Sequence, residues 1–348
     1  MQLGTIAVSD LRREFRTARR REGLRGAWQG LWQPQYQTKA AVDGINFTIV
    51  QGEIVGYIGA NGAGKSTTIK MLTGIVVPTG GTILVNGRDP QADRYAHTRD
   101  IGVVFGQRTQ LWWDLPVIEA LRLLQTVFAV DTATFTQRLA RFDEVLGLGE
   151  LLHTPVRKLS LGQRMRCDLA ASLIHQPPVV FLDEPTIGLD VAVKAQIRQF
   201  IQAINKEIGT TFVLTTHDLG DIEALCRRVM VIDGGKLIYD GDLSRMKGSF
   251  GQERILVFDL ATPLTIAAIS EAVAMPALQW EQTAPERLTC RFDGLQANPA
   301  AIVAAVMQQA DVRDLSLLET DIETIVKRIY RHGYVVPQVP GGPIGTPS

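Results

Sequence analysis

Short apolar runs recur along the first two thirds of the chain. Those at 53–58, 101–105, 178–182 and 212–216 are short and contain mainly valine, isoleucine, leucine and phenylalanine. Runs of this kind are typical of strands that are buried on both faces, as in a parallel sheet. Each run is followed by glycine, by acidic residues or by histidine. The pattern therefore predicts buried strands whose carboxyl ends carry glycine or polar residues.

The pattern becomes helical between 112 and 152. Segments 117–128 and 134–146 carry apolar residues three and four positions apart, which predicts two amphipathic helices. Alternation of buried strands with helices is typical of an α/β fold. Further helices are expected at 67–72, from about 163 to 174, and from about Val191 onward.

A second unit is expected after Asp242. The pattern there predicts a strand, a helix, a hairpin, a helix and a last helix, which together suggest a small α+β domain at 243–335. The tail at 336–348 contains four prolines and three glycines, so we expect it to be disordered. The predicted elements are the strand 255–259, the helix 263–273, the hairpin strands 278–280 and 287–292, the helix 300–309 and a helix carrying Ile322, Ile325, Val326 and Ile329.

Composition narrows the class of protein. The chain has 348 residues, of which 45% are hydrophobic and 21% charged, so it is long and apolar enough for two globular domains. Lys+Arg and Asp+Glu both number 36, and this balance argues against nucleic acid as a partner. The scattered Cys167, Cys226 and Cys290 are expected to be reduced thiols of a cytosolic protein. No signal peptide and no apolar run near the ~20 residues of a membrane span is visible.

The strongest chemical signal is Gly59-Ala-Asn-Gly-Ala-Gly-Lys-Ser-Thr67. It fits G-x-x-x-x-G-K-[ST] between a predicted strand and a predicted helix, which is the context that a phosphate-binding loop requires. There the backbone amides surround the phosphates, Lys65 contacts the outer phosphates and Ser66 binds Mg²⁺. The expected ATP-binding residues of this loop are Gly59, Asn61, Gly62, Ala63, Gly64, Lys65, Ser66 and Thr67.

A second pair of candidates is Asp183-Glu184, directly after the apolar run 178–182. Carboxylates at the carboxyl end of a central parallel strand lie beside the phosphate loop in doubly wound folds. We expect Asp183 to hold Mg²⁺ and Glu184 to polarise an attacking water, which makes the reaction hydrolysis.

The third candidate is the start of the helix after Lys158-Leu-Ser-Leu-Gly-Gln-Arg-Met-Arg166. Ser160 alone can serve as the N-cap, whereas Gly162 in the first turn costs about 1 kcal/mol relative to alanine. A helix start with a hydroxyl and a bare glycine backbone can, however, receive an anion. Stability does not explain Gly162, but anion binding does.

Together these motifs resemble the nucleotide-binding subunit of an ABC transporter, from about Leu3 to Asp242. The resemblance implies an α/β fold, a P-loop NTPase ABC cassette at 1–242 with a mixed central sheet and a helical subdomain at 107–175, plus the small C-terminal α+β domain. It also implies that Ser160, Gly162 and Gln163 clamp the γ-phosphate of ATP bound by the other subunit of a head-to-tail dimer. Leu161 departs from the glycine that is common at its position.

Other residues are assigned by the same resemblance. Gln107 matches the glutamine that senses Mg²⁺ and the attacking water, and His217 matches the histidine that contacts the γ-phosphate. Asp190 matches a loop that communicates across the dimer, and it also fits an N-cap for the following helix. Phe15 matches the aromatic residue that stacks on adenine, with Trp32 and Tyr36 as alternatives.

An insertion at about 16–37 is the least family-like part of the cassette. Seven arginines and two glutamates lie between Arg12 and Arg25, followed by an apolar helical stripe. One interpretation is contact with anionic lipid headgroups or with a membrane partner. The other is a solvated basic segment whose tryptophans pack on the domain's own surface. The stripe consists of Leu24, Trp28, Leu31 and Trp32.

Three function classes compete for this sequence. A P-loop kinase or GTPase does not need the 158–166 motif. A soluble ABC ATPase of translation or DNA repair usually has two cassettes or a long coiled coil, and this chain has one phosphate loop. The favoured class is a transport ATPase, resembling the drug and viologen exporters, with ATP and Mg²⁺ as cofactors.

This class implies specific partners and a location. The partners are a second ATPase subunit, either a copy or a paralogue, and two transmembrane permease subunits. The location is peripheral, on the cytoplasmic face of the inner membrane. At least one of Trp112 and Trp113 is expected to line the groove that receives a permease helix; the alternative is that both rings pack within the helical subdomain.

Overall fold

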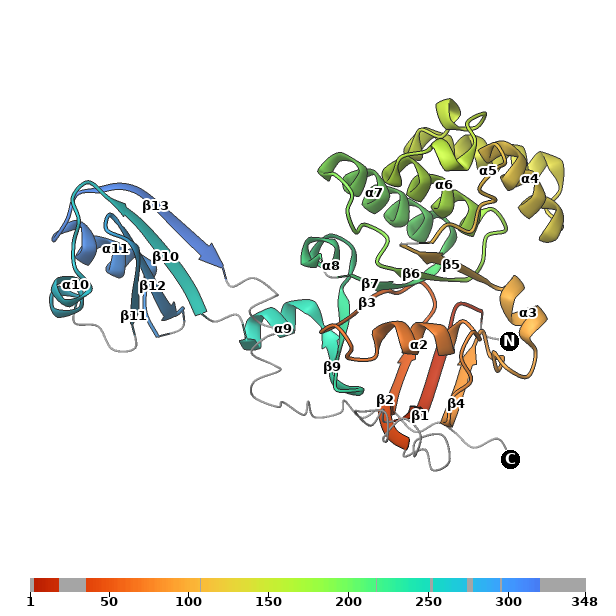
Figure 1. The fold of residues 1–348 in the computed structure, drawn as a ribbon. Coiled ribbons are helices and arrows are strands. Elements are labelled where there is room, and N and C mark those ends of the chain that lie inside the picture. The colour runs from red at the N-terminus through yellow and green to blue at the C-terminus, as the bar shows by residue number, and fades with distance from the viewer. Residues whose placement is uncertain are drawn as a thin grey trace, which may run out of the picture. The chain divides into compact units, whose positions relative to one another are not determined.

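The structure is a computed structural model that describes residues 3–18, 36–106, 108–216, 218–250, 253–273, 278–294 and 296–319. The chain divides into two compact units, Met1–Gly241 with Val335–Ser348, and Asp242–Tyr334 (Figure 1). The predicted candidates Gln107 and His217 lie outside the described residues.

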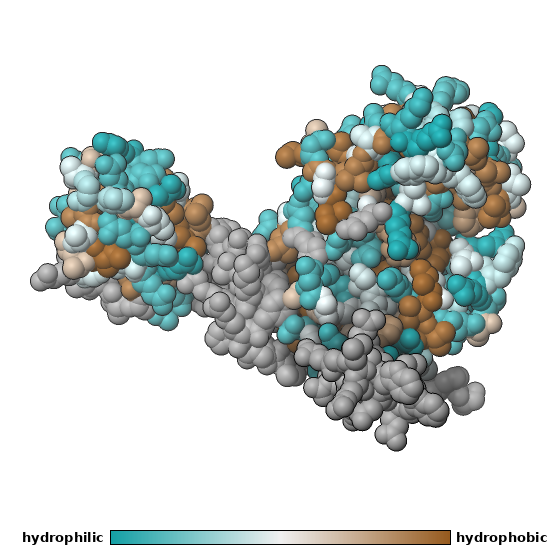
Figure 2. Space-filling view, in the orientation of Figure 1, coloured by the Kyte–Doolittle hydropathy of each residue, from teal (hydrophilic) through white to brown (hydrophobic). Residues whose placement is uncertain are grey.

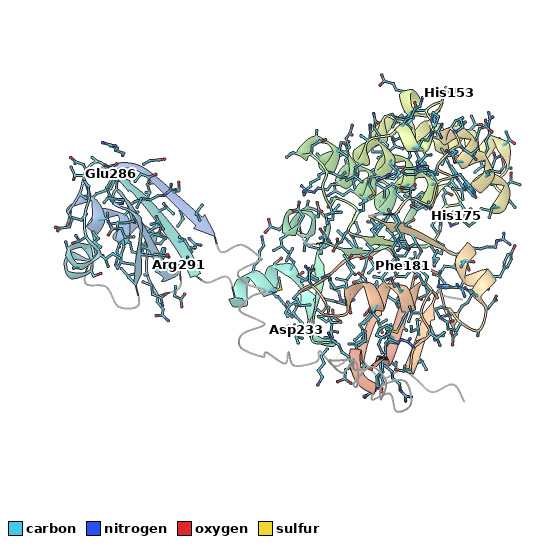
Figure 3. The ribbon with its side chains drawn as sticks, in the orientation of Figure 1. His153, His175, Phe181, Asp233, Glu286 and Arg291 are labelled. Carbon is cyan, nitrogen blue, oxygen red and sulfur yellow. The ribbon has the colours of Figure 1, made fainter. Side chains whose placement is uncertain are left out.

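A six-stranded sheet forms the centre of the first unit. Its order is β5-β6-β7-β3-β8-β9, and the pairs β5–β6, β6–β7, β7–β3 and β3–β8 are parallel. The four apolar runs are strands of this sheet, as predicted, and Phe181 is fully buried within it (Figure 3). The strands are β3 (Ile54–Gly59), β5 (Ile101–Phe105), β6 (Val179–Asp183), β7 (Thr211–Thr215), β8 (Arg228–Asp233) and β9 (Lys236–Asp242).

An antiparallel sheet in the order β2-β1-β4 completes the unit. β1 (Ile6–Ala18) and β2 (Tyr36–Ile49) form a long ribbon in which Ala18 pairs with Tyr36, and β4 is Gly80–Val85. Both ends of the predicted insertion are therefore strands. The apolar stripe from Leu24 to Trp32 lies outside the described residues.

Seven α-helices connect these strands in the described residues. α4 (Val117–Val127) and α5 (Thr132–Leu146) match the two predicted amphipathic helices. α5 packs against α7, where the rings of Phe142 and Phe200 meet edge to face with centroids 5.3 Å apart. The others are α2 (Lys65–Leu72), α3 (Arg94–Arg99), α6 (Leu161–Leu173), α7 (Val191–Ile208) and α8 (Leu219–Leu225), with short 3₁₀ turns at Gly149–Leu151 and Val156–Lys158.

The second unit is an antiparallel sheet in the order β11-β12-β10-β13 with its own apolar core. The predicted strand, hairpin and two helices are present, whereas β13 was not predicted and the helix carrying Ile322 lies outside the described residues. The elements are α9 (Leu243–Phe250), β10 (Glu253–Leu260), α10 (Ile266–Ala272), β11 (Gln279–Ala284), β12 (Arg287–Asp293), α11 (Pro299–Met307) and β13 (Val312–Glu319).

Hydrophilic and hydrophobic residues are interspersed on the faces of both units drawn in Figure 2. Cys167, Cys226 and Cys290 are free and buried, and burial raises the pKa of each thiol to about 12. They are therefore protonated near neutral pH. In the described part of the chain, none of the helices has the length and apolarity needed to cross a bilayer.

Candidate nucleotide-binding site

The loop from Gly59 to Gly64 joins β3 to the start of α2. A Cβ on Gly59 would lie 2.4 Å from the Ile232 carbonyl oxygen, and one on Gly64 would lie 2.4 Å from the Ala41 carbonyl oxygen. Neighbouring backbone therefore excludes any side chain at both positions. Gly62 differs, because its φ is +80° and a Cβ there would meet nothing within 4 Å. Its backbone faces open space at the beginning of a helix, where amides attract anions.

No side chain caps α2 at its N-cap residue, Gly64. The first amides of the helix therefore lack a side-chain acceptor there. Asn61 and Ser66 are exposed, Thr67 is half-buried and Ala63 is buried. An exposed Ser66 hydroxyl at the helix start is a suitable oxygen ligand for Mg²⁺ beside a phosphate.

Lys65 is the cation of the site. Its Nζ donates to the carbonyl oxygens of Gly59, at 2.6 Å, and Ala60, at 3.2 Å, and only 6% of the residue is exposed. Burial lowers the pKa of Lys65, while the nearby charges of Glu184 and Asp183 act to raise it. The ammonium thus lies within the field of both predicted carboxylates.

Asp183 is the last residue of β6, Glu184 follows it, and both are held by β7. The Thr215 hydroxyl donates to Asp183 Oδ1 at 2.5 Å, and the Glu184 amide donates to the Thr215 carbonyl at 2.9 Å. Glu184 has φ of +55°, which is uncommon for a residue with a side chain and costs free energy that the surrounding contacts must offset.

Gly106 was not predicted, although it precedes Gln107. Its amide donates to the Asp183 carbonyl at 2.8 Å, and a Cβ on it would lie 2.1 Å from the Glu184 carbonyl oxygen. The chain that leads into Gln107 therefore lies directly against the backbone of the two acids. Neither Gly106 nor Thr215 was assigned a role at the site from the sequence, although Thr215 lies in the predicted strand 212–216.

Ser160 is the N-cap of α6, as predicted. Its Oγ accepts from the Gln163 amide at 3.3 Å, and Gln163 Oε1 accepts from the Ser160 amide at 2.9 Å, which makes a capping box. A Cβ on Gly162 would lie 3.3 Å from Val193 of α7. Gly162 therefore also allows α6 and α7 to approach, a packing role that the sequence did not reveal.

Asp190 is the N-cap of α7, since its Oδ1 accepts from the Val193 amide at 2.9 Å. The N-cap alternative for this residue is confirmed. Gly162 of the 158–166 motif lies close to α7, whereas Lys65 bonds the loop carbonyls of Gly59 and Ala60 and is within the field of the two acids. The predicted residues thus form two groups within one chain.

Phe15 lies in β1 and is 40% exposed. The guanidinium of Arg13 lies over its ring, 4.6 Å from the centroid, so one face is covered by a cation. Trp32, an alternative adenine contact, lies outside the described residues, and Tyr36 pairs with Ala18 in the ribbon.

Trp112 and Trp113 are 46% and 50% exposed. The loop that carries them is held by α6, because Asp168 Oδ1 accepts hydrogen bonds from the Thr109 hydroxyl at 2.8 Å and from the Gln110 amide at 3.1 Å. Neither residue is buried, although the guanidinium of Arg164 in α6 lies over the Trp113 ring, 5.5 Å from its centroid.

Similarity to known proteins identifies the family of this chain. The family pattern described as ABC transporter matches residues 42–187. The daunorubicin/doxorubicin resistance ATP-binding protein DrrA of Streptomyces peucetius is 30% identical over 299 residues, which cover 85% of this chain and 90% of that protein. This chain belongs to the ABC transporter family. It contains the ATPase domain that defines the ATP-binding subunits of this family.

A longer human relative and a solved structure show which part of other ABC proteins this chain corresponds to. ATP-binding cassette sub-family A member 10 of Homo sapiens is 30% identical over 297 residues, and the chain spans only 19% of its length. A solved structure, an ATP binding subunit of an ABC transporter, superposes with a TM-score of 0.59 at 23% identity over 70% of this chain and 92% of that one. That likeness shows the ABC cassette fold.

Proposed function

We propose that this chain hydrolyses ATP at the edge where Lys65, Asp183 and Glu184 meet and that this hydrolysis drives export through separate membrane subunits. The observation that carries the proposal is the buried Lys65 ammonium in the field of two carboxylates, beside a loop whose Gly62 faces open space. Such a site attracts an outer phosphate and places acids beside it.

Each side chain has a defined task in hydrolysis. The amides at the start of α2 and Lys65 bind the phosphates, and Ser66 with Asp183 supplies oxygen ligands for Mg²⁺. The ion neutralises charge on the outer phosphates when it is bound. Glu184 accepts a proton from the attacking water. We assign Gln107 and His217 to the water and the γ-phosphate, because each follows a strand that ends at this edge.

A second subunit completes the site. Ser160 Oγ accepts a hydrogen bond from the Gln163 amide, which leaves the hydroxyl hydrogen available to donate to a phosphate. Ser160 and the Gly162 backbone would bind the γ-phosphate held by Lys65 of the other chain in a head-to-tail dimer with two-fold symmetry. Asp190, at the start of α7, lies beside this group. The partner is a copy of this chain or a paralogue.

The membrane partners are proposed to be two transmembrane permease subunits. The half-exposed Trp112 and Trp113 offer large aromatic anchors of the type enriched at interface hot spots. The chain would then lie peripherally on the cytoplasmic face of the inner membrane. Export is supported by the name of the Streptomyces relative, which describes drug resistance.

Two finer assignments belong to this proposal. Phe15 would stack on adenine with the ring face opposite Arg13. The insertion at 16–37 would contact anionic lipid headgroups, because four of its arginines are clustered in the sequence between Ala18 and Tyr36, the last described pair of the β1–β2 ribbon.

The test is Glu184→Gln, with Glu150→Gln as a control at an exposed glutamate. Glutamine keeps the shape but cannot accept the proton, so turnover should fall on the order of 100-fold or more. ATP affinity should stay near that of the wild type, and sedimentation should detect an ATP-dependent dimer. Near-normal turnover in Glu184→Gln would remove this residue from the base role. A wild-type protein that binds but never hydrolyses ATP would overturn the proposed function.

A further inference from the structure

Two loops leave the central sheet next to each other and carry residues of the proposed hydrolytic site. β6 and β7 are parallel neighbours in which Asp183 pairs with Thr215. Glu184 follows β6, and His217 follows β7 after Thr216. Something must set the position of one loop relative to the other beyond the ends of the strands.

The side chain of Asp221, in the first turn of α8, contacts both loops. Its Oδ2 accepts from the Thr186 hydroxyl and from the Thr216 hydroxyl, the latter at 3.2 Å. Thr186 is two residues after Glu184, and Thr216 immediately precedes His217. One carboxylate oxygen therefore joins the two loops.

The other oxygen of Asp221 is held from α7. Its Oδ1 accepts from Arg198 Nε at 2.7 Å, and Arg198 Nη2 lies 2.5 Å from the same atom. Lys194, one turn earlier, lies 2.5 Å from Asp218, the residue after His217. α7 thus fixes the carboxylate and also the far side of the His217 loop.

The cluster of Asp221, Thr186 and Thr216 is almost entirely buried, with exposures of 0%, 2% and 3%. Burying a charge costs solvation free energy, and apolar side chains of similar volume are often as stabilising as a buried ion pair. Stability alone therefore does not account for this cluster. A fully bonded buried network instead restricts its members to one arrangement.

Glu184 depends on such a restriction. Its φ of +55° is strained, so the contacts on either side of it must hold it there. On one side its amide donates to Thr215, and on the other side the Thr186 hydroxyl donates to Asp221.

We propose that Asp221 is a positioning residue that, through Thr186 and Thr216, holds Glu184 and the end of β7 in the arrangement that hydrolysis needs. It touches neither nucleotide nor water in this role, which rests on the hydrolysis proposed above. The phosphate loop is not part of the cluster, so the network acts on turnover and not on ATP affinity.

Thr186→Val tests this because valine keeps the shape and removes the hydroxyl. We expect kcat to fall on the order of tenfold to a hundredfold, since small displacements of catalytic groups have effects of this size. The dissociation constant of ATP, measured on the same preparation, should change by less than about threefold. Thr186→Ser, which restores the hydroxyl, should return kcat to within about threefold of the wild type.

Two further variants keep the test sharp. If both hydroxyls act through one carboxylate, Thr216→Val combined with Thr186→Val should lose less kcat than the product of the two single losses. The control is Thr136→Val at an exposed position of α5, where the Thr136 hydroxyl donates to the Thr132 carbonyl at 2.8 Å; kcat of this variant should be unchanged.

The outcomes separate the two proposals. Wild-type kcat in Thr186→Val, equal falls in ATP affinity and kcat, or no recovery in Thr186→Ser would each overturn the positioning role. Absence of turnover in the wild type would instead contradict the proposed function. A lowered melting temperature with wild-type kcat at a temperature where the variant is folded would assign the cluster to stability alone.

Discussion

Replacing Asp168 by asparagine should change how the stability of the ATPase unit depends on pH. Asp168 lies in α6, is 4% exposed, and has a pKa raised from 3.8 to about 6. Burial is the main cause; the hydrogen bond from the Thr109 hydroxyl acts in the opposite direction and is the smaller effect. Asparagine can keep the bonds that Oδ1 accepts from Thr109 and Gln110, so the variant should fold.

The raised pKa of Asp168 decides whether its contribution to stability grows or falls with pH. A carboxyl whose pKa is higher in the folded state binds its proton more tightly there, so it stabilises the fold at low pH. This contribution is fully present below pH 3.8 and is lost as the pH rises through about 6. A rise from 3.8 to about 6 corresponds to about 3 kcal/mol in total, of which about 1.4 kcal/mol is lost between pH 5 and pH 7.5.

The measurement is the free energy of unfolding from urea titrations at pH 5, 6 and 7.5. Trp280 is the one tryptophan of the second unit, so a Trp280→Phe background confines the fluorescence signal to the ATPase unit. Subtracting wild type from Asp168→Asn cancels the other titrating groups. The free energy of unfolding of Asp168→Asn minus that of the wild type should increase by about 1.4 kcal/mol from pH 5 to pH 7.5.

Asp131→Asn is the matched control. Asp131 is the N-cap of α5, and hydrogen bonds from Thr134 lower its pKa below the ordinary value. Its contribution is present above pH 3.8 and is lost only as the pH falls through the lower folded value, so its difference from wild type should be flat from pH 5 to pH 7.5. A flat difference for Asp168→Asn as well would refute the reasoning, and a shift in favour of the wild type would show that hydrogen bonding outweighs burial.

Two further predictions concern the membrane. Trp112→Ala should weaken assembly with the permease subunits by more than ~2 kcal/mol while the isolated subunit keeps its melting temperature, as measured by co-purification titration and calorimetry; a core role would instead destabilise the isolated subunit by about 3–5 kcal/mol. Neutralising the insertion arginines should weaken binding to anionic liposomes by about 1 kcal/mol per contacting residue, less so in high salt, and salt-independent binding would contradict lipid contact. The arginines to replace are Arg19, Arg20, Arg21 and Arg25.

Local patterns predicted most of the first unit because its strands and helices obey simple periodicities. The run 178–182 is apolar on both faces because β6 is an inner strand of the sheet, and this burial is what a continuous apolar run records. β13 was missed because it is an edge strand in which Leu315, Leu317 and Leu318 are partly exposed. Its pattern is therefore neither a clean alternation nor a buried run.

The contacts of the site were less predictable, since they join residues that are distant in the sequence. Thr215 and Asp221 belong to the chain around His217, yet they bind Asp183 and Thr186, more than thirty residues earlier. A threonine at a strand end and an aspartate in a first helical turn are common for local reasons. Only the pairing of β6 with β7 gives them a role at the acids.

The glycines near the phosphate loop also show contacts between segments that are distant in the sequence. Gly59 and Gly64 belong to one recognisable motif and Gly106 does not. All three positions nevertheless exclude a side chain for the same reason, because a Cβ there would lie 2.4, 2.4 and 2.1 Å, respectively, from a backbone oxygen. Gly62 lies within the motif, and a Cβ on it would meet no atom within 4 Å outside its own chain neighbours. The two glycines of G-x-x-x-x-G therefore meet one physical demand, close packing of the loop against neighbouring backbone, whereas Gly62 between them lies on the open side where phosphates are proposed to bind. Close packing also applies at Gly106, where a Cβ would lie 2.1 Å from the Glu184 carbonyl oxygen, so the backbone before Gln107 packs directly against the residue proposed to activate water.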